Sequence, residues 1–182
     1  MKKSTFLVTG GCGFIGSHIV EALVKKGHKV RILDNLSTGK IENIASVSPH
    51  NAELLVGDIA SLSMVETAME GCDYVFHEAA IASVPKSIED PIGTAKVNYG
   101  GTLNILHTAH KYGVRRVVFA GSAAVYGDEP TLPKSELMPA MPITPYGVDK
   151  LASELIGHFY ARTLGLEFVS LRYFNVFGLR QD

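Results

Sequence analysis

Short apolar runs alternate with stretches of helical periodicity from one end of the chain to the other. The apolar runs lie at Thr5–Thr9, Lys29–Leu33, Glu53–Val56, Tyr74–His77, Arg115–Ala120 and Glu167–Leu171. Runs this short, the first of them ending at glycines, are typical of buried strands in a parallel sheet. Helical patterns lie between them at Phe14–Lys26, Ser61–Met69, Pro91–Tyr112 and Pro145–Leu164. This alternation predicts an α/β fold, a doubly wound parallel sheet with helices on both faces.

Two helical patterns show which positions face the core. In the first, Ile15, Ile19, Ala22 and Leu23 recur at helical spacing, and Gly27 is expected to end the helix. In the last, the apolar positions are Leu151, Leu155 and Ile156. The proline-rich stretch from Asp128 to Pro145 has little periodicity and predicts a long irregular loop, which in a compact domain is usually functional.

Composition narrows the class of protein. The 182 residues, 46% hydrophobic and 19% charged, suit a single soluble domain over residues 1–182. A net charge of −1 argues against nucleic-acid or anionic-membrane partners, and no run approaches the roughly 18 apolar residues of a membrane span. Cys12 and Cys72 have neither disulfide nor metal-ligand spacing. We therefore expect reduced, packed thiols, no metal and a cytoplasmic protein.

Glycines gather where the first strand passes into the first helix. Residues Thr9–Gly16 read TGGCGFIG, with G-x-x-G-x-x-G spacing instead of the G-x-G-x-x-G of many dinucleotide-binding loops. Gly10 would permit the tight turn, Gly13 the approach of a pyrophosphate, and Gly16 close packing of helix on strand. Free N–H groups at the helix N-terminus would bind the phosphates. The order of strand, loop and helix predicts a dinucleotide site.

Two carboxylates follow the second and third strands. Asp34 is expected to accept hydrogen bonds from the adenosine ribose hydroxyls, although a turn or cap role is the alternative. A carboxylate there would repel a 2′-phosphate, and the nearest basic residue downstream is Lys40, so NAD is favoured over NADP. Asp58 is expected either beside the adenine or as the N-cap of the next helix.

Acid/base chemistry is indicated at the start of the last helix. Tyr146 and Lys150 are spaced to share one helix face. A tyrosine base at neutral pH needs its pKa lowered by about three pH units, and a lysine ammonium and a cationic nicotinamide both act in that direction. Ser122 closes the fifth strand and can bind a substrate hydroxyl. These three residues predict a catalytic triad, the alternative being three unrelated surface residues.

With these residues the chain resembles the extended short-chain dehydrogenase/reductase family, specifically its NAD-dependent nucleotide-sugar epimerases and dehydratases. The likeness covers essentially the whole chain and is carried by Val8–Gly16, Asp34–Ser37, Gly57–Ile59, His77–Ala80, Val97–Thr102, Ser122–Gly127, Pro145–Lys150 and Leu171–Gly178. It is strongest to UDP-glucose and UDP-N-acetylglucosamine 4-epimerases. Ala82–Ser87 and Phe177–Asp182 resemble the N-acetylhexosamine branch in particular.

The resemblance implies a Rossmann fold with NAD as cofactor and a UDP-sugar as substrate. The implied NAD contacts are Gly10, Gly13, Phe14, Ile15, Gly16, Asp34, Asn35, Ser37, Thr38, Gly39, Asp58, Ile59, Ala79, Ala80, Asn98, Tyr146, Lys150 and Phe174. Asn98 and Phe174 would flank the nicotinamide. The implied substrate contacts are Ser83, Ser122, Tyr146 and Asn175, and the implied reaction is C4 epimerisation of a UDP-hexose through a 4-keto intermediate.

Three alternatives remain beside the epimerase. Dehydratases of the family place an Asp-Glu pair after the Ser/Thr, and its decarboxylases use a glutamate there, whereas this chain has Ala123 and Ala124. The sequence therefore favours an epimerase over both enzymes. The third alternative is an NAD-binding module without turnover. One departure from the family is Glu78, at a position that is usually apolar or an amide.

The resemblance also implies expectations about size and assembly. Family members continue beyond the position of Asp182 into a smaller lobe that holds the nucleotide, and this substrate lobe is expected to be absent here. The 182-residue chain is therefore expected to bind NAD but to turn over no UDP-sugar. Family members usually form homodimers through the helices that correspond to Pro91–Tyr112 and Pro145–Leu164.

Overall fold

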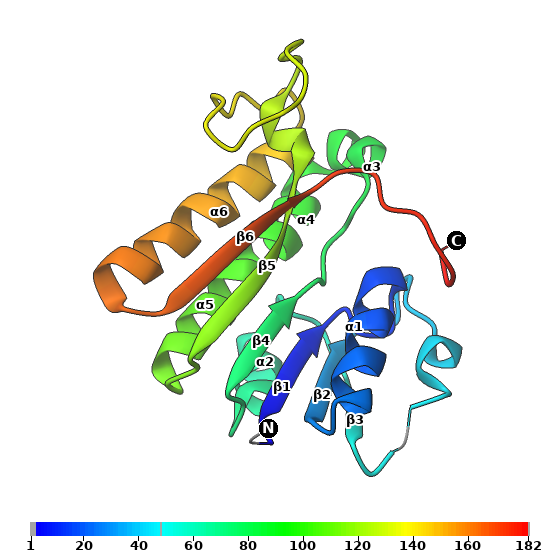
Figure 1. Ribbon diagram of the computed structural model, residues 1–182. Coiled ribbons are helices and arrows are strands. Elements are labelled where there is room, and N and C mark those ends of the chain that lie inside the picture. Colours follow the sequence, from blue (N-terminus) through cyan, green and yellow to red (C-terminus); the bar gives the residue numbers. More distant parts are fainter. Residues whose placement is uncertain (1–2, 48, 182) are drawn as a thin grey trace.

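The computed structural model describes residues 3–47 and 49–181, and its six strands form one parallel sheet in the order β3-β2-β1-β4-β5-β6 (Figure 1). The strands are β1 (Thr5–Thr9), β2 (Lys29–Asp34), β3 (Ala52–Val56), β4 (Tyr74–His77), β5 (Arg116–Ser122) and β6 (Glu167–Tyr173). The predicted doubly wound Rossmann sheet is therefore confirmed. The predicted strand ends differ from the observed ones by at most two residues, as is usual for element boundaries.

The helices depart from the prediction in the middle of the chain. They are α1 (Phe14–Lys25), α2 (Leu62–Met69), α3 (Val84–Glu89), α4 (Pro91–Ala95), α5 (Gly101–Lys111) and α6 (Pro145–Leu164), with 3-10 turns η1 (Ile41–Ile44) and η3 (Ala123–Tyr126). The single helix predicted over Pro91–Tyr112 is divided by a π-helical turn, η2 (Lys96–Gly100). Helix α3 was not predicted; it begins because Ser83 caps it and Pro85 occupies its first turn.

Helices cover the two faces of the sheet unequally (Figure 1). Helix α1 packs on β1 and β2, whereas α2, α5 and α6 form a row on the opposite face. Successive residues of β1 point to opposite faces, so Leu7 joins the core beneath the row of helices and Val8 joins the core beneath α1. The buried face of α1 is formed by Gly16, Val20 and Leu23. Ala22, predicted to face the core, is exposed.

The chain adds β2 and β3 on one side of β1, and the connection from β3 then crosses to β4 on the other side of β1. This reversal of strand order places a crevice between β1 and β4. These two strands are paired, with Thr9 opposite His77 at their carboxyl ends. In open α/β sheets, ligands bind at such a switch point. The glycine segment after Thr9 and the segment after His77 both begin at this edge.

Helix α6 is positioned by its first turn. Thr144 caps it by accepting a hydrogen bond from the Gly147 N–H at 3.1 Å, and Pro145 lies at its first position. Gly165 ends it in the left-handed region with φ 75°. Among the described residues, none of the helices is long and apolar enough to cross a membrane.

Candidate dinucleotide and catalytic site

The glycine segment folds as a tight loop that leaves no room for side chains. Gly10 has φ +67°, and a Cβ there would lie 2.8 Å from the Ala79 nitrogen of the segment after β4. A Cβ at Gly16 would collide with the carbonyl oxygen of Gly10. Gly11, which sequence analysis did not single out, lies against the Ile32 side chain, 2.7 Å from where its Cβ would be. The absence of a side chain at Gly10 thus lets the ends of β1 and β4 lie close together, in addition to permitting the turn.

The N-terminus of α1 is open toward this loop. Gly13 is the N-cap residue, and in the described structure no side chain caps this end. Gly13 N–H donates to the Gly10 carbonyl at 3.0 Å, while the N–H groups of Phe14, Ile15 and Gly16 belong to the uncapped first turn. An uncapped helix end behind a glycine loop fits a pyrophosphate, because its N–H groups and the helix dipole both favour an anion.

Asp34 ends β2 beside the glycine loop and is buried. Its Oδ2 accepts the Cys12 N–H and its Oδ1 accepts the Leu36 N–H, each at 2.9 Å. The turn role considered from the sequence is therefore present. Each carboxylate oxygen can accept a second donor, so the same side chain still fits a ribose with two hydroxyls.

The residues expected around the adenosine form one neighbourhood. Asn35 donates to Asp58 Oδ2 at 2.9 Å, so the ends of β2 and β3 are linked. Asp58 is not the N-cap of α2, since Ser61 holds that place and Asp58 Oδ1 accepts the Ala60 N–H of its own turn. The side chain of Ile59 is buried against Gly101, which leaves its backbone for any contact with adenine. Ser37 and Thr38 are exposed, and Gly39 lies against the Asp34 carboxylate.

A buried chain of hydrogen bonds fixes the segment after β4. His77 lies between the hydroxyls of Thr9, at 2.7 Å, and Thr102, at 3.0 Å. The Thr9 hydroxyl also accepts the Ala79 N–H at 3.2 Å. Burial lowers the pKa of His77 to about 3, and the charge of Lys150 acts in the same direction. His77 is therefore neutral at physiological pH and holds Ala79 and its neighbour Ala80 beside the glycine loop.

Asn98 lies in the π-helical turn and is 3% exposed. Its side chain accepts the Ile81 N–H at 2.8 Å and donates to the Ile81 carbonyl at 3.2 Å. Both ends of the amide therefore hold the segment after β4, and the predicted place of Asn98 beside the nicotinamide stays a prediction. π turns are frequent at functional sites, and this one directs Asn98 toward the crevice.

The structure brings Ser122, Tyr146 and Lys150 together at the carboxyl ends of β4 and β5. The Ser122 side chain lies near the Tyr146 hydroxyl and acts to lower the pKa of Tyr146. Lys150 Nζ lies 5.8 Å from the centre of the Tyr146 ring and donates to the Ala120 carbonyl at 2.8 Å. Sequence analysis missed Ser87, a buried residue whose hydroxyl accepts the Tyr146 N–H at 3.1 Å and fixes the start of α6.

Burial at this site favours a neutral tyrosine. It raises the pKa of Tyr146, and the nearby Ser122 side chain opposes that effect in part. Burial lowers the pKa of Lys150 to about 8, against the charges of Glu78 and Asp149, which favour the ammonium. A tyrosine base needs a lowered pKa, whereas the chain by itself raises the pKa of Tyr146. A further positive charge is needed for Tyr146 to ionise at neutral pH.

The residues expected to contact the sugar are more exposed and make fewer contacts within the chain than those expected to contact the dinucleotide. Ser83 accepts the Lys86 N–H at 3.3 Å as the N-cap of α3. Phe174 stacks on the Tyr126 ring but is 58% exposed, and Asn175 is exposed. Residues 174–181 then run from β6 toward α1 (Figure 1), where Arg180 pairs with Glu21 at 2.6 Å.

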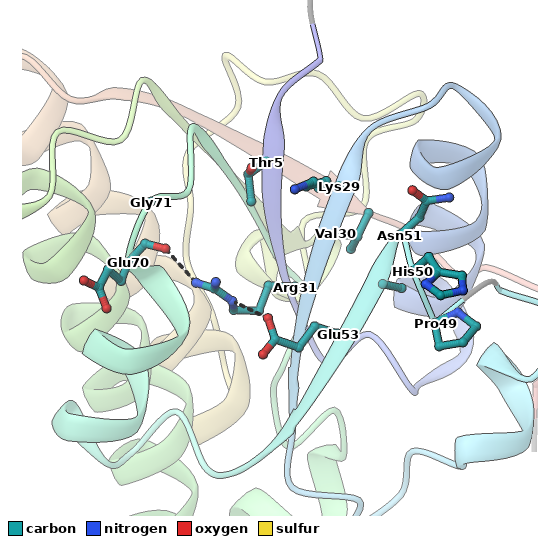
Figure 2. A pocket seen from close by; sticks show the side chains of 11 residues that line it. Thr5, Lys29, Val30, Arg31, Pro49, His50, Asn51, Glu53, Glu70 and Gly71 are labelled. Carbon is teal, nitrogen blue, oxygen red and sulfur yellow. Dashed lines mark hydrogen bonds and ion pairs between the residues drawn. The ribbon is translucent and has the colours of Figure 1, made fainter.

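A hollow at the opposite edge of the sheet is occupied by contacts that join strands and a helix. It lies among the first residues of β1, β2 and β3, and Arg31 crosses it (Figure 2). Arg31 donates to the Glu53 carboxylate at 3.2 Å and to the Glu70 carbonyl at 2.6 Å. These contacts join β2, β3 and the end of α2 on the side away from the glycine loop. Cys12 and Cys72 are free and buried, as expected for packed thiols.

Known proteins resemble this chain along nearly its whole length. The model of the NAD dependent epimerase/dehydratase family matches residues 6–182. A putative UDP-glucose 4-epimerase of Methanocaldococcus jannaschii is 43% identical over 178 residues, which make up 97% of this chain and 57% of that protein. The chain spans about half the length of the curated relatives it matches.

Solved structures show the same fold. A UDP-N-acetylglucosamine 4-epimerase from Methanobrevibacter ruminantium, in complex with UDP-N-acetylmuramic acid, superposes with TM-score 0.95 at 41% identity, over 100% of this chain and 58% of the other. A Thermus thermophilus UDP-glucose 4-epimerase in complex with NAD gives 0.91 at 44% identity, over 98% and 57%. The dTDP-glucose 4,6-dehydratase DesIV from Streptomyces venezuelae, with NAD and TYD bound, gives 0.92 at 34%, over 97% and 57%.

Proposed function

The chain belongs to the NAD-dependent epimerase/dehydratase family, and we propose that its activity is the inversion of carbon 4 of a UDP-hexose. The substrate pair is UDP-glucose/UDP-galactose or UDP-N-acetylglucosamine/UDP-N-acetylgalactosamine. The observation that carries the proposal is that Ser122, Tyr146 and Lys150 lie close together at the switch point. Next to them are the uncapped N-terminus of α1 and the buried carboxylate of Asp34, which is proposed to bind the ribose. The cofactor is NAD, and these residues fit it.

In the proposed reaction, bound NAD supplies a hydride acceptor with a positive charge. Tyr146 takes the proton of the 4-hydroxyl and later returns it, while Ser122 holds that hydroxyl in place by a hydrogen bond. Lys150 contributes the positive charge that stabilises the phenolate. A 4-keto sugar that turns over in the site then receives its hydrogen on the other face, so no net oxidation occurs.

The raised pKa of Tyr146 gives this scheme an order of events. Burial keeps the phenol protonated in the chain alone. A tyrosine base therefore requires the cofactor's charge in addition to that of Lys150. Proton abstraction is in this way restricted to the complex in which a hydride acceptor is present.

The two residues after Ser122 support epimerisation over elimination. Ala123 and Ala124 begin the η3 turn, and neither has a side chain that can transfer a proton. A 4,6-dehydratase needs an additional acid/base pair near carbon 6, and this chain offers none at these positions. Although the fold resembles that of DesIV, the residues after Ser122 therefore do not support dehydration by this chain.

A homodimer is part of the proposal. Apolar side chains are exposed on the outer surface of α3, α4 and α6, namely Ile88, Ile92, Val148, Leu155 and Phe159. Leu155, which the periodicity placed in the core, is 61% exposed. An exposed apolar surface of this kind favours association, and these helices include those expected to pair. Leu155→Glu is expected to convert a dimer into a monomer in light scattering, with Leu132→Glu in the irregular loop as the control.

We also place the proposed activity in the cytoplasm, because two free buried thiols suit a reducing compartment.

The decisive experiment for the function is product analysis with UDP-glucose and UDP-N-acetylglucosamine side by side, on a protein of the relatives' full length that contains this chain. Interconversion of either sugar with its C4 epimer supports the proposal. Formation of a 4-keto-6-deoxy sugar, or no product from either substrate, would contradict it.

A further inference from the structure

The proposed chemistry makes no use of a carboxylate that lies beside the catalytic lysine. Glu78 is the first residue after β4, at the crevice between β1 and β4. Its Oε1 accepts a hydrogen bond from the Tyr173 hydroxyl of β6 at 3.5 Å. Its Oε2 is buried and has no hydrogen-bond partner among the described residues. Burial of an ionised carboxylate oxygen without a partner is costly, so Glu78 stays protonated unless a nearby cation compensates its charge.

Lys150 is that cation. Its side chain leaves α6 and is 5% exposed, and its Nζ donates to the Ala120 carbonyl at 2.8 Å. The charge of Glu78 favours the protonated form of Lys150, and the charge of Lys150 favours the ionised form of Glu78. The described structure has no direct ion pair between them. His77 pairs with Phe119, so Glu78, the next residue, lies at the level of Ala120, whose carbonyl accepts from Lys150 Nζ.

We propose that Glu78 is a positioning residue of the catalytic site, which acts through Lys150 by keeping its ammonium protonated next to Tyr146. This inference rests on the proposed role of Lys150. Its test, however, needs neither substrate nor turnover.

Among the titratable groups around Lys150, Glu78 is the one whose charge changes near neutral pH. Burial raises the pKa of Glu78 to about 7, and burial lowers that of Lys150 to about 8. On β6, burial and the charge of Glu78 raise the pKa of Tyr173 to about 12, so its hydroxyl stays a donor. On β4, His77 stays neutral, and on α6, Asp149 is a second carboxylate that favours charged Lys150. Glu78 and Lys150 are therefore both ionised only within a narrow interval near neutrality.

The test is a titration of Lys150 itself by carbon-13 NMR. The 182-residue chain is labelled at lysine Cε, the Lys150 signal is assigned with Lys150→Arg, and its midpoint is measured in the unmodified protein and in Glu78→Gln. The amide can still accept from Tyr173 but has no charge. We expect the Lys150 midpoint to fall by about one pH unit, the lower end of what a nearby charge produces.

Two variants separate charge from structure. Glu78→Asp keeps the charge and is expected to restore most of the midpoint. Glu167→Gln removes a carboxylate from an exposed ion pair with Arg116, distant from the crevice, and should leave Lys150 unchanged. A Glu78→Gln variant that is folded by circular dichroism and has an unchanged Lys150 midpoint would overturn the proposal.

A measurement on the unmodified protein covers the case in which Glu78→Gln does not fold. With glutamate labelled at Cδ, Glu78 should titrate near neutrality, and the Lys150 signal should show an inflection at the same pH, as coupled groups do. A Lys150 curve without that inflection also overturns the proposal. If Lys150 responds as expected but the full-length protein forms no epimer, the proposed function fails while this coupling stands.

Discussion

The two halves of the sheet are built differently. The half formed by β3, β2 and β1 is covered on both faces, by α1 with η1 and by α2. The half formed by β4, β5 and β6 is covered on one face by α5 and α6, and on the other face Val169 is 38% exposed and Leu171 is 41% exposed. The residues predicted to bind the dinucleotide come mainly from the first half, and those predicted to bind the sugar come from the second.

The same contrast holds for the side chains of the site. Asp34 is buried with both carboxylate oxygens hydrogen-bonded, and Gly10 is confined by the backbone of Ala79. Phe174 and Phe177, after β6, are 58% and 89% exposed. The side chains predicted to bind the cofactor are therefore fixed by contacts within this chain, whereas those predicted near the sugar are not. Each of the following experiments tests where that boundary lies.

The largest effect is expected from the 182-residue chain alone. It should bind NAD, because the loop, the helix end and Asp34 are in place, but form no detectable epimer from a UDP-sugar. Transfer requires reacting atoms within roughly 3–3.5 Å and exclusion of water, which exposed residues such as Phe174 do not provide. Calorimetric titration with NAD is the control for folding. Sustained product at a rate near that of a full-length enzyme would remove the contrast between the two halves.

The second effect concerns Tyr146 in a protein of the relatives' full length. Tyr146→Phe should lower turnover by a factor on the order of 10² or more, the usual scale for loss of an acid/base group, and leave NAD affinity nearly unchanged. Tyr112→Phe, on the exposed end of α5, is the matched control. Near-normal turnover of the Tyr146 variant would exclude Tyr146 as the base.

A third effect lies on the boundary between the halves, where His77 and Glu78 have opposite influences on stability. The pKa of His77 is lowered to about 3, so its contribution is lost as pH falls from 6.5. The pKa of Glu78 is raised from 4.5 to about 7, so its contribution is lost as pH rises through that interval. Between pH 4.5 and 6.5 the two slopes cancel in the unmodified protein.

Glu78→Gln should expose the slope that His77 produces. As pH falls from 6.5 to 4.5, the variant is expected to lose about 2–3 kcal/mol of unfolding free energy relative to the unmodified protein. Urea unfolding at the two pH values measures this difference, with Glu167→Gln as the control. Parallel pH dependence of the two proteins would mean that Glu78 is already ionised at pH 4.5.

How far the sequence could predict these features depends on the range of the interactions. The doubly wound parallel sheet follows from the alternation of strands and helices, and the glycine loop and the Tyr146/Lys150 spacing are local, so all three could be predicted. Nothing local in the sequence shows that the Asn98 amide is hydrogen-bonded to the Ile81 backbone, so this contact could not be predicted. The contact of Ser87 with Tyr146 likewise joins residues that are 59 apart in the chain.

Energies were harder to predict than positions. The sequence indicates that a lysine near Tyr146 should lower the tyrosine pKa, but burial depends on the assembled layers, and burial decides the direction. The π turn likewise depends on contacts that form only when the layers assemble. Periodicity predicts one helix over Pro91–Tyr112, while the hydrogen bonds of Asn98 and Thr102 inside the crevice accompany a local change of helical pitch.

A fourth experiment sharpens the description of the first half. Asp34→Ala should reduce the preference for NAD over NADP by roughly tenfold, since the carboxylate that repels a 2′-phosphate is removed. The variant also deprives the Cys12 and Leu36 N–H groups of their acceptor, so it should unfold at a lower temperature. Asp58→Ala is the control and should affect both cofactors alike. Equal affinity for NAD and NADP in the unmodified chain would show that Asp34 does not face the ribose.

The smallest effect is expected from the tail that joins the two halves. Arg180 donates to Glu21 at 2.6 Å and to the Ser17 hydroxyl at 3.3 Å, and His18 contacts the Leu179 carbonyl at 3.0 Å. These contacts hold residues 176–181 against α1, whose N-terminus is the proposed phosphate site. Arg180→Ala should release the tail without unfolding the domain, because partly exposed ion pairs contribute little to stability.

Hydrogen exchange is the appropriate measurement, since it reports local opening. Exchange at residues 176–181 should accelerate a few-fold in Arg180→Ala, while strand β1 keeps its protection. Lys25→Ala removes the other ion partner of Glu21 and leaves the tail contact intact, so it should change nothing in the tail. If the tail exchanges equally fast in all three proteins, Arg180 does not join the halves, and NAD affinity should then be insensitive to it. If exchange accelerates and NAD affinity falls with it, the tail belongs to the dinucleotide half despite its position after β6.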